Sequence, residues 1–378
     1  MPQDDVTEAV LGREEVVRYL RDSQGETLLE AKERVHSYLD ELRTTQRYRM
    51  YRALQHPLYP LLRKIDRQQA HVEIARAATR HHRVIYASNH KSHTDYLVQP
   101  LVLDDNGVRP PVIAAGINLF GGALGLVQRH VIGAIPIRRE MKDPLYLATL
   151  KAYVAEALQR HDLFLYLEGG RSYSGELRPF KTGLLHAAAQ ARRPDVVVVP
   201  VAIAYDLMLE DFVLARQRVK RQQRLFAREL AEMVRYAVGY RSRAIVSFGA
   251  PIPLADYDPD GRRSMVELKR RLRDAIGRLY TVVPTALVAT AMRSSLRRVE
   301  LESEIDRVIE RLRMFGARLD VQTGRDAVEV ATEAMVTRKI LVVEGDRYRV
   351  RERDVLRYYA RTIEHLLKDR GSSAHSHH

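Results

Sequence analysis

Four short apolar runs, several of them bounded by turn residues, constrain the fold of this chain more than any other feature. They occupy residues 84–87, 164–167, 196–201 and 244–248. Three of them are rich in valine, isoleucine or aromatic residues, which is typical of strands buried on both faces of a sheet. Helical stretches lie between them, for example at residues 145–160 and 182–192. This alternation of strands and helices predicts an α/β core.

The rest of the sequence differs in texture from this core and predicts separate regions around it. The predicted regions are an N-terminal helical region (1–75), the α/β core (76–256), a connecting helix and linker (257–284), a mostly helical C-terminal domain (285–370) and a disordered tail (371–378). Within the C-terminal domain, three helical runs precede a β-hairpin at residues 340–350, and a final helix follows. This order resembles a winged-helix unit.

Charge and cysteine content limit the possible functions. Lys and Arg number 62 against 48 Asp and Glu, which gives a net charge of +14. A basic surface attracts nucleic acid, anionic lipid and phosphorylated substrates alike. Cysteine is absent, which excludes a disulfide scaffold, a thiolate metal site and a cysteine nucleophile.

No stretch is long and apolar enough to predict a membrane-spanning helix, which needs about 18–20 consecutive apolar residues. The nearest candidate, residues 112–127, is interrupted by glycines. We interpret it as a buried segment with glycine turns, and an apolar patch around Phe120 that dips into a membrane surface is the alternative. The N-terminus has no basic start followed by an apolar run, so we expect no secretory signal.

The first chemical motif is the segment 89–95, Asn-His-Lys-Ser-His-Thr-Asp, directly after a predicted strand. His90 and Asp95 are spaced to form an imidazole–carboxylate pair, in which the carboxylate fixes the tautomer and the other ring nitrogen takes up a proton. A polar helix cap explains the same residues without chemistry. A metal site that includes His93 is a weaker alternative, because no further ligand set is evident.

A second motif, Glu168-Gly169-Gly170-Arg171-Ser172, ends another predicted strand, and Lys181 follows it. A strand, a glycine pair and a helix place bare backbone N–H groups near a ligand anion, and Arg171 and Lys181 add charge that suits a phosphate. An exposed tight turn is the alternative.

Two weaker motifs complete the set. Arg138 and Arg139 end an apolar run. These arginines either keep the end of a strand soluble or add positive charge to a site. Pro200 lies inside a predicted buried strand, and because proline belongs at strand edges or bulges, it is a candidate for shaping a pocket wall.

Taken in this order, the four motifs resemble the four blocks of the glycerolipid acyltransferase superfamily. The likeness is strongest to the bacterial glycerol-3-phosphate 1-O-acyltransferases, and it extends from about residue 80 to the last helix. It is carried by the segments 90–96 (HKSHTDY), 113–119 (IAAGINL), 168–172 (EGGRS), 181–183 (KTG), 247–252 (SFGAPI) and 356–360 (LRYYA). Two positions depart from the pattern. Lys91 stands where arginine is usual, and Tyr173-Ser174 replaces Arg-Thr, which removes one phosphate ligand that Arg178 or Lys181 would replace.

The resemblance implies a mixed sheet flanked by helices and a specific reaction. A fatty acyl group would pass from acyl-CoA or acyl carrier protein to the sn-1 hydroxyl of glycerol 3-phosphate, with His90 as general base and Asp95 orienting it. The implied substrate-binding positions are Lys91, Ser92, Arg138, Arg139, Glu168, Gly169, Gly170, Arg171, Ser172 and Lys181. Arg139, Arg171, Ser172 and Lys181 are expected to contact the phosphate, Glu168 to shape the site or bond a substrate hydroxyl, and residues 113–127 with 201–203 to line the acyl slot. No metal and no cofactor besides the thioester co-substrate is expected.

The partners expected are therefore glycerol 3-phosphate, the thioester and an anionic membrane surface, with the protein peripheral on the cytoplasmic face of the cell membrane. Arg43, Arg47, Arg49 and Arg52 fall near one face of a helix, and the segment 209–236 is basic, so both are candidates for lipid contact. Transfer to lysophosphatidate or dihydroxyacetone phosphate is the alternative within the superfamily. Nucleic-acid binding through the winged-helix-like region is the alternative outside it, but the helix at 325–338 carries acidic residues that repel phosphate.

Overall fold

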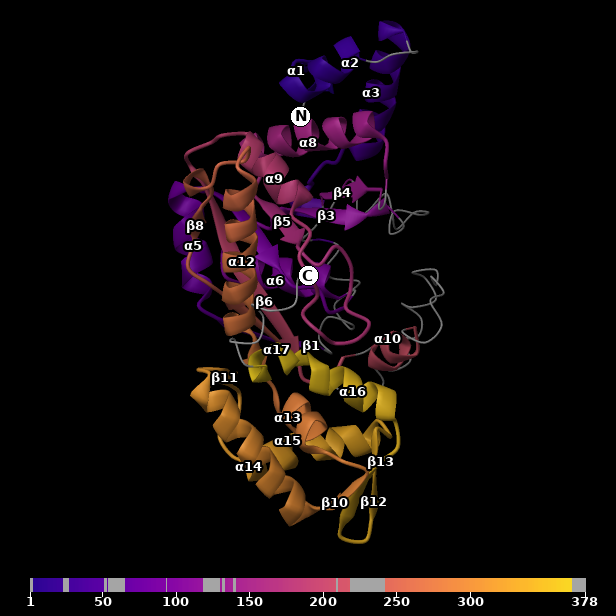
Figure 1. Cartoon of the computed structure of the whole chain (residues 1–378), viewed down its shortest axis with the longest axis vertical. Coiled ribbons are helices and arrows are strands. Elements are labelled where there is room, and N and C mark those ends of the chain that lie inside the picture. Colours follow the sequence, from indigo (N-terminus) through magenta and orange to yellow (C-terminus); the bar gives the residue numbers. More distant parts are fainter. Residues whose placement is uncertain are drawn as a thin grey trace.

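The computed structural model of the chain places a central sheet between two groups of helices, one N-terminal and one C-terminal (Figure 1). It describes residues 3–22, 27–50, 53, 65–92, 94–117, 130, 133–138, 141–208, 210–217 and 242–368. Several predicted features lie outside these residues: Arg52, His93, Phe120, Arg139, most of the basic segment 209–236, and the tail 371–378.

The central sheet has eight strands and is mixed, as the sequence predicts. Its order is β1 (Ile65–Ala70), β7 (Ser242–Phe248), β6 (Val196–Tyr205), β2 (Arg83–Ser88), β5 (Leu163–Tyr166), β3 (Val112–Gly116) and β4 (Ala134–Ile137), and the short β8 (Ile252–Pro253) pairs with β6. β6 runs antiparallel to β7 and β8, and the other neighbours are parallel. The carboxyl ends of β2, β5 and β6 therefore meet at one edge of the sheet, where the motifs lie.

All four apolar runs form strands of this sheet. β6 is buried at every one of its ten positions, because it lies between β2 and β7 and helices cover the sheet. Pro200 is accommodated within β6 by a gap in pairing: β8 pairs with residues 197–198 and β7 with residues 201–205. The Pro200 carbonyl accepts from Gly249 at this gap, so the missing N–H of proline interrupts no strand ladder.

Helices follow the strands along the chain. They are α5 (Val72–His81), α6 (Asp95–Asp105), α8 (Pro144–Arg160), α9 (Gly183–Gln190), α10 (Asp211–Gln217) and α12 (Arg262–Leu279). α9 packs on α8, and α10 packs on α16 (Arg353–Thr362) of the C-terminal region. α5 contacts β2 and β7, α6 contacts β1 and β7, and α12 contacts β6. α8 begins where a helix signal stands in the sequence, since the Asp143 carboxylate accepts from Leu145 N at 2.9 Å and Pro144 occupies the first turn.

The N-terminal region forms three helices, α1 (Gln3–Leu11), α2 (Glu14–Asp22) and α3 (Leu28–Leu42), all of which contact α8. Ion pairs join this region to the core. Arg13, between α1 and α2, pairs with Glu156, and Arg34 of α3 pairs with Asp143. The sheet begins at β1, earlier than residue 76, where the core was predicted to start. β1 pairs in parallel with β7 along its whole length.

The C-terminal region is mostly helical, as predicted. It comprises β9 (Thr281–Val282), α13 (Pro284–Ala291), β10 (Ser295–Arg297), α14 (Arg298–Met314), β11 (Arg318–Leu319), α15 (Gly324–Thr337), β12 (Leu341–Glu344), β13 (Arg347–Val350), α16 (Arg353–Thr362) and α17 (Glu364–Leu367). The predicted hairpin is present as β12 and β13, and β10 adds a third antiparallel strand. A helix (α13), a strand (β10), two helices (α14 and α15) and the hairpin thus follow one another in an order that resembles a winged-helix unit (Figure 1).

Candidate active site

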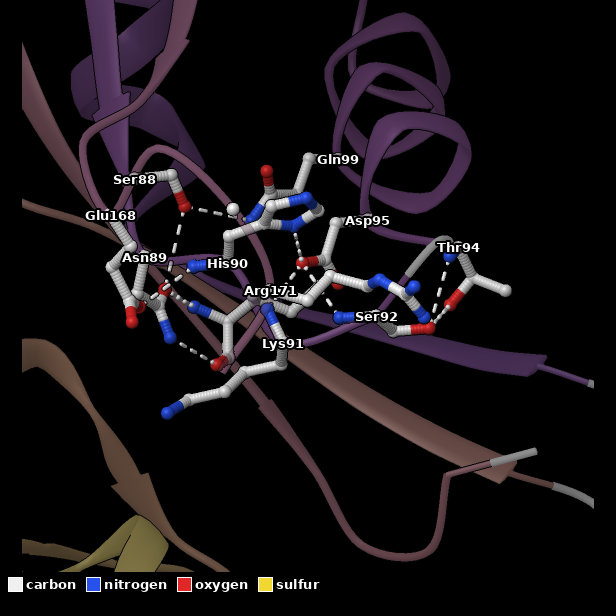
Figure 2. Close-up of polar contacts among 12 residues, drawn as sticks. Ser88, Asn89, His90, Lys91, Ser92, Thr94, Asp95, Gln99, Glu168 and Arg171 are labelled. Atoms are coloured by element: carbon white, nitrogen blue, oxygen red, sulfur yellow. Dashed lines mark hydrogen bonds and ion pairs between the residues drawn. The ribbon is translucent and has the colours of Figure 1, made fainter. Parts of the chain in front are cut away.

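His90 and Asp95 form the pair that the sequence predicts. His90 follows β2, Asp95 is the first residue of α6, and His90 Nδ1 lies 2.8 Å from Asp95 Oδ2 (Figure 2). Because Nδ1 faces the carboxylate, it carries the proton in the neutral ring, and Nε2 is left as the basic nitrogen. The His90 side chain also stacks on Tyr166, with ring centroids 4.4 Å apart. The imidazole is thus held by a hydrogen bond at one edge and a ring on one face.

The Asp95 carboxylate is the centre of a hydrogen-bond network. It is fully buried, and its Oδ2 accepts from the backbone N–H groups of Lys91 (2.6 Å) and Ser92 (3.0 Å) as well as from His90. Its Oδ1 accepts from the Tyr205 hydroxyl at 2.8 Å. Burial raises the pKa of Tyr205 well above its usual range, so this hydroxyl stays protonated as a donor. Four donors among the described residues hold the carboxylate in one orientation. The His–Asp pair is therefore formed, whereas the helix-cap alternative is not, because the N-cap residue Thr94 makes no side-chain cap hydrogen bond.

Polar side chains before the pair fix the end of β2. Asn89 donates from Nδ2 to Ile203 O at 2.9 Å and accepts from Ile203 N at 2.8 Å. Gln99 of α6 donates to the Ser88 hydroxyl. These bonds join the strand end to β6 and to α6, so the loop that carries His90 is attached on two sides (Figure 2).

Glu168 joins the two motifs. One carboxylate oxygen accepts from His90 N at 2.9 Å and the other from Arg178 N at 3.0 Å. Because both oxygens accept backbone N–H groups, the structure supports the predicted shaping role of this side chain. The turn that follows requires glycine at position 169, where φ is +63°.

Lys91 and Ser92 are predicted to bind substrate, and their side chains lie away from the His90 ring. The Lys91 ammonium is buried and donates to the carbonyl oxygens of Gly175 (2.6 Å) and Glu176 (3.2 Å). Burial lowers the pKa of Lys91. The Ser92 hydroxyl pairs with the hydroxyl and the backbone N–H of Thr94. The partners of both side chains belong to the protein itself. The structure therefore gives Lys91 a role in fixing the loop at residues 175–176, and Ser92 a role in fixing the turn before α6.

Arg171 and Ser172 lie beside the His90 loop. Ser172 N donates to His90 O at 3.1 Å. Arg171 Nη1 lies 3.6 Å from Glu210 Oε1, and its guanidinium is 5.4 Å from the ring centroid of Tyr173. Ser172 is fully buried, and its hydroxyl has no hydrogen-bond partner among the residues that the structure describes. A buried hydroxyl without a partner beside an arginine is a feature that a bound anion would satisfy.

A cavity of about 480 Å³ opens next to His90. Its wall is mostly apolar and includes Ile113, Ile137, Leu150, Leu165, Leu184 and Leu185. Gly169, Gly170, Arg138 and Lys181 also line it. Residues 201–203 do not belong to this lining, because that part of β6 is buried on both faces. The cavity therefore joins an apolar slot to basic side chains that include Arg138, directly after β4, and Lys181, shortly before α9.

Arg138 and Lys181 bring positive charge to this cavity in different ways. The Arg138 guanidinium is bound to the Glu41 carboxylate, with Nε 2.8 Å from Oε1, and this hydrogen bond raises its pKa. Its charge is thus already balanced. Lys181 is exposed, and its methylene groups pack where a Cβ on Gly169 would lie. Of the two, Lys181 is the better placed to contact a substrate anion.

Two residues that support this site, Tyr166 and Tyr205, were not predicted from the sequence, and they end β5 and β6. Arg178, which was predicted as a substitute phosphate ligand, donates from its guanidinium to the carbonyls of Gly170 and Arg171. Both tyrosines could have been predicted from their positions. They end the two strands next to β2, and side chains at the carboxyl ends of neighbouring parallel strands converge.

Two properties of the described residues bear on membrane and metal binding. No helix among them has the length and apolar character needed to cross a bilayer. No three His, Asp or Glu side chains in the same part of the chain are grouped so that they could hold a metal ion.

Comparison with known proteins adds the family. The family model described as Acyltransferase matches residues 69–204. A glycerol-3-phosphate acyltransferase from Aeromonas hydrophila subsp. hydrophila is 28% identical over 91% of this chain and 47% of its own length. One from Pseudomonas syringae pv. syringae is 30% identical over 74% of this chain and 37% of its own length.

The chain thus spans less than half the length of these curated relatives. Among solved structures, the 1-acyl-sn-glycerophosphate (LPA) acyltransferase PlsC from Thermotoga maritima covers 69% of this chain and 83% of its own, with 16% identity and a TM-score of 0.36, which is too low to add to the assignment. The family match contains both the His90–Asp95 pair and the Glu168–Ser172 motif. Residues 69–204 therefore match the Acyltransferase family, and the chain is a homologue of bacterial glycerol-3-phosphate acyltransferases, as its motifs predict.

Proposed function

We propose that this protein transfers a fatty acyl group from acyl-CoA or acyl carrier protein to the sn-1 hydroxyl of glycerol 3-phosphate. The observation that carries the proposal is the orientation of His90. Its Nδ1 faces the buried Asp95 carboxylate, and the residue lines a cavity whose wall is apolar and whose rim carries Lys181. An acyl thioester and a phosphorylated alcohol need these three elements together.

In the proposed mechanism, His90 Nε2 removes the proton of the substrate hydroxyl as the oxygen attacks the thioester carbonyl. Asp95 stabilises the imidazolium that forms. The tetrahedral intermediate collapses with cleavage of the C–S bond, and the leaving thiolate takes the proton from His90. No covalent acyl-enzyme, metal or further cofactor is needed.

The oxyanion requires N–H donors near the end of β5. Gly169 N already donates to Tyr166 O at 3.0 Å, so it is engaged within the turn. Gly170 lines the cavity and is the candidate donor that remains from the predicted pair.

The substrate phosphate is assigned to Arg171, Ser172 and Lys181. The buried Ser172 hydroxyl and the Arg171 guanidinium supply donors on one side of His90, and Lys181 supplies charge on the cavity side. Arg139, which lies outside the described residues, is retained as a fourth ligand on the strength of the family resemblance alone.

The test of the proposal is a thiol-release assay with acyl-CoA and with acyl carrier protein. The acceptors compared are glycerol 3-phosphate, dihydroxyacetone phosphate and lysophosphatidate. We expect release that depends on glycerol 3-phosphate and a 1-acyl product. Release that depends on lysophosphatidate instead would contradict the proposed acceptor.

Replacing Arg171 or Lys181 with alanine is expected to raise KM for glycerol 3-phosphate and to leave KM for the thioester nearly unchanged. A hydrogen bond to a charged group contributes roughly 1.5–3 kcal/mol, which corresponds to about 10- to 150-fold. Steady-state kinetics with each substrate varied in turn measure this split. A rise in the thioester KM alone would place these residues in the donor site.

We also propose that the protein binds membranes peripherally, on the cytoplasmic face of the cell membrane, because its product is amphiphilic and leaves into lipid. Arg47 and Arg49 are exposed and keep the predicted lipid-facing role, whereas the Arg43 guanidinium pairs with Asp40 and Thr7. This corrects the interpretation of Arg43 as a lipid-facing residue.

Exchanging Arg47 and Arg49 for glutamate is expected to lower partition onto anionic vesicles by roughly tenfold or more. Each arginine contributes about 1 kcal/mol, and anionic lipid repels the new carboxylates. Sedimentation with vesicles of increasing anionic lipid, at low and high salt, measures the effect. The control carries the same charge change at Arg262 and Arg263, which are exposed on α12. Equal loss of partition in both variants would show that Arg47 and Arg49 have no specific role in membrane binding.

A further inference from the structure

A buried polar cluster joins the C-terminal helices to the segment between β6 and α10. Arg338 directly follows α15, Tyr359 belongs to α16, Asp211 begins α10 and Glu210 precedes it. All four side chains are at least nine-tenths buried. Ionisable groups in such a place are costly unless they are paired, so their contacts indicate what they hold in position.

The two C-terminal side chains converge on Asp211. Arg338 donates from Nη2 to Asp211 Oδ1, and the Tyr359 hydroxyl donates to Asp211 Oδ2 at 2.7 Å. Both residues also bind the main chain of Met208: Arg338 Nη1 donates to its carbonyl, and Met208 N donates to the Tyr359 hydroxyl at 2.8 Å. The backbone on both sides of residue 209 is thereby fixed from the C-terminal helices.

Glu210 lies between these two anchored positions and faces the catalytic region. Its Oε1 is 3.6 Å from Arg171 Nη1. Glu210 and Arg171 are both buried, so their electrostatic interaction is little screened by solvent. The position of the Arg171 guanidinium therefore depends on a carboxylate whose own backbone is held by Arg338 and Tyr359.

A second contact ties the same motif to α16. Gly175 has φ of +87°, and a Cβ there would overlap the Tyr358 carbonyl oxygen, so the loop passes directly against this helix. Glu176 forms an ion pair with Arg361. The loop that follows Arg171 and Ser172 is thus packed against the C-terminal region at residues 175 and 176.

From this chain of contacts we infer that Arg338 and Tyr359 are positioning residues for the acceptor site, which act through Asp211 and Glu210 on the Arg171 guanidinium. The inference deepens the proposed function and rests on it, because Arg171 is the assigned phosphate ligand. The C-terminal region, on this view, tunes the affinity for the phosphorylated acceptor without contacting it.

The test uses the full-length protein with a single hydroxyl removed. Tyr359→Phe removes the hydrogen bond to Asp211 and the one from Met208 N. It is expected to raise KM for glycerol 3-phosphate by about 3- to 10-fold, with KM for the thioester unchanged. Tyr358→Phe is the matched control. Tyr358 is the neighbouring residue on α16 and is equally buried, but its hydroxyl contacts only Met208 Sδ among the described atoms, at 3.7 Å. It should leave both KM values unchanged.

A double-mutant cycle separates positioning from general destabilisation. If Tyr359 acts through Arg171, then Tyr359→Phe in an Arg171→Ala background changes the acceptor KM by less than about 1.5-fold. Arg338→Lys, which keeps the charge, should show a milder version of the same acceptor-specific effect. Additive effects in the cycle, or parallel changes in both KM values, would overturn the inference.

Failure of the proposed function gives a different result. A wild-type enzyme that uses another phosphorylated acceptor, with the same coupling between Tyr359 and Arg171, would refute glycerol 3-phosphate as substrate and support the positioning role.

Discussion

His90→Ala is expected to lower kcat by roughly 10²–10⁴-fold, the usual contribution of a general base. The structure makes this a clean test, because among the described residues the His90 imidazole has one hydrogen bond, to Asp95, and one ring contact, with Tyr166. Neither supports the backbone. The melting temperature should therefore change little, and KM for glycerol 3-phosphate should stay close to that of the wild type.

Asp95→Ala is expected to lower turnover similarly and, in addition, to destabilise the loop. Its carboxylate accepts the N–H groups of Lys91 and Ser92 and the Tyr205 hydroxyl. The two N–H groups would be left buried without this acceptor, whereas the Tyr205 hydroxyl would keep its contact with Thr94 Oγ1. Asp95→Asn keeps one acceptor oxygen and serves as the control.

Near-normal turnover of His90→Ala with an unchanged melting temperature would rule out the proposed base.

Much of the site could be predicted because its chemistry lies at strand ends. His90 and Glu168 follow apolar runs that are buried in the core of the sheet, and parallel strands bring their carboxyl ends together. The spacing between His90 and Asp95 in the sequence then predicted that the two side chains pair. The sequence therefore predicted both the fold class and the His–Asp pair.

What could not be predicted depends on tertiary contacts. β1 has the sequence IDRQQA and lies at the edge of the sheet. An edge strand pairs with a neighbour on one side only, and it lacks the continuous apolar run by which a central strand is recognised. Likewise, the Lys91 ammonium binds carbonyls of a loop more than eighty residues away. The charge of Arg138 is balanced by Glu41, which belongs to the N-terminal helices. Such partners cannot be inferred from residue type or spacing.

The strongest effect on stability is expected from Arg338→Met. Asp211 is fully buried, and Arg338 is its cationic partner among the described residues. Removing one member of a buried ion pair leaves an uncompensated charge and costs about 3–5 kcal/mol in the free energy of unfolding. Urea denaturation measures this loss. Arg270→Met on α12 is the control, because Arg270 pairs with Glu267 in an exposed setting, where little change is expected.

The pH dependence of this loss identifies Asp211 as its source. Burial raises the pKa of Asp211 even beside Arg338, and loss of the arginine would raise that pKa further. A carboxyl whose pKa is higher in the folded than in the unfolded state stabilises the fold at low pH and loses this contribution as the pH rises through the folded-state pKa. The loss in unfolding free energy of Arg338→Met relative to wild type should therefore be smaller at about pH 5 than at about pH 8.

Adding Asp211→Asn should restore most of the lost stability at the higher pH, since it removes the unpaired charge and keeps an oxygen for Phe212 N. A deficit that is independent of pH, or that Asp211→Asn does not relieve, would show that Arg338 stabilises the protein by packing against Phe212 and not by pairing with Asp211.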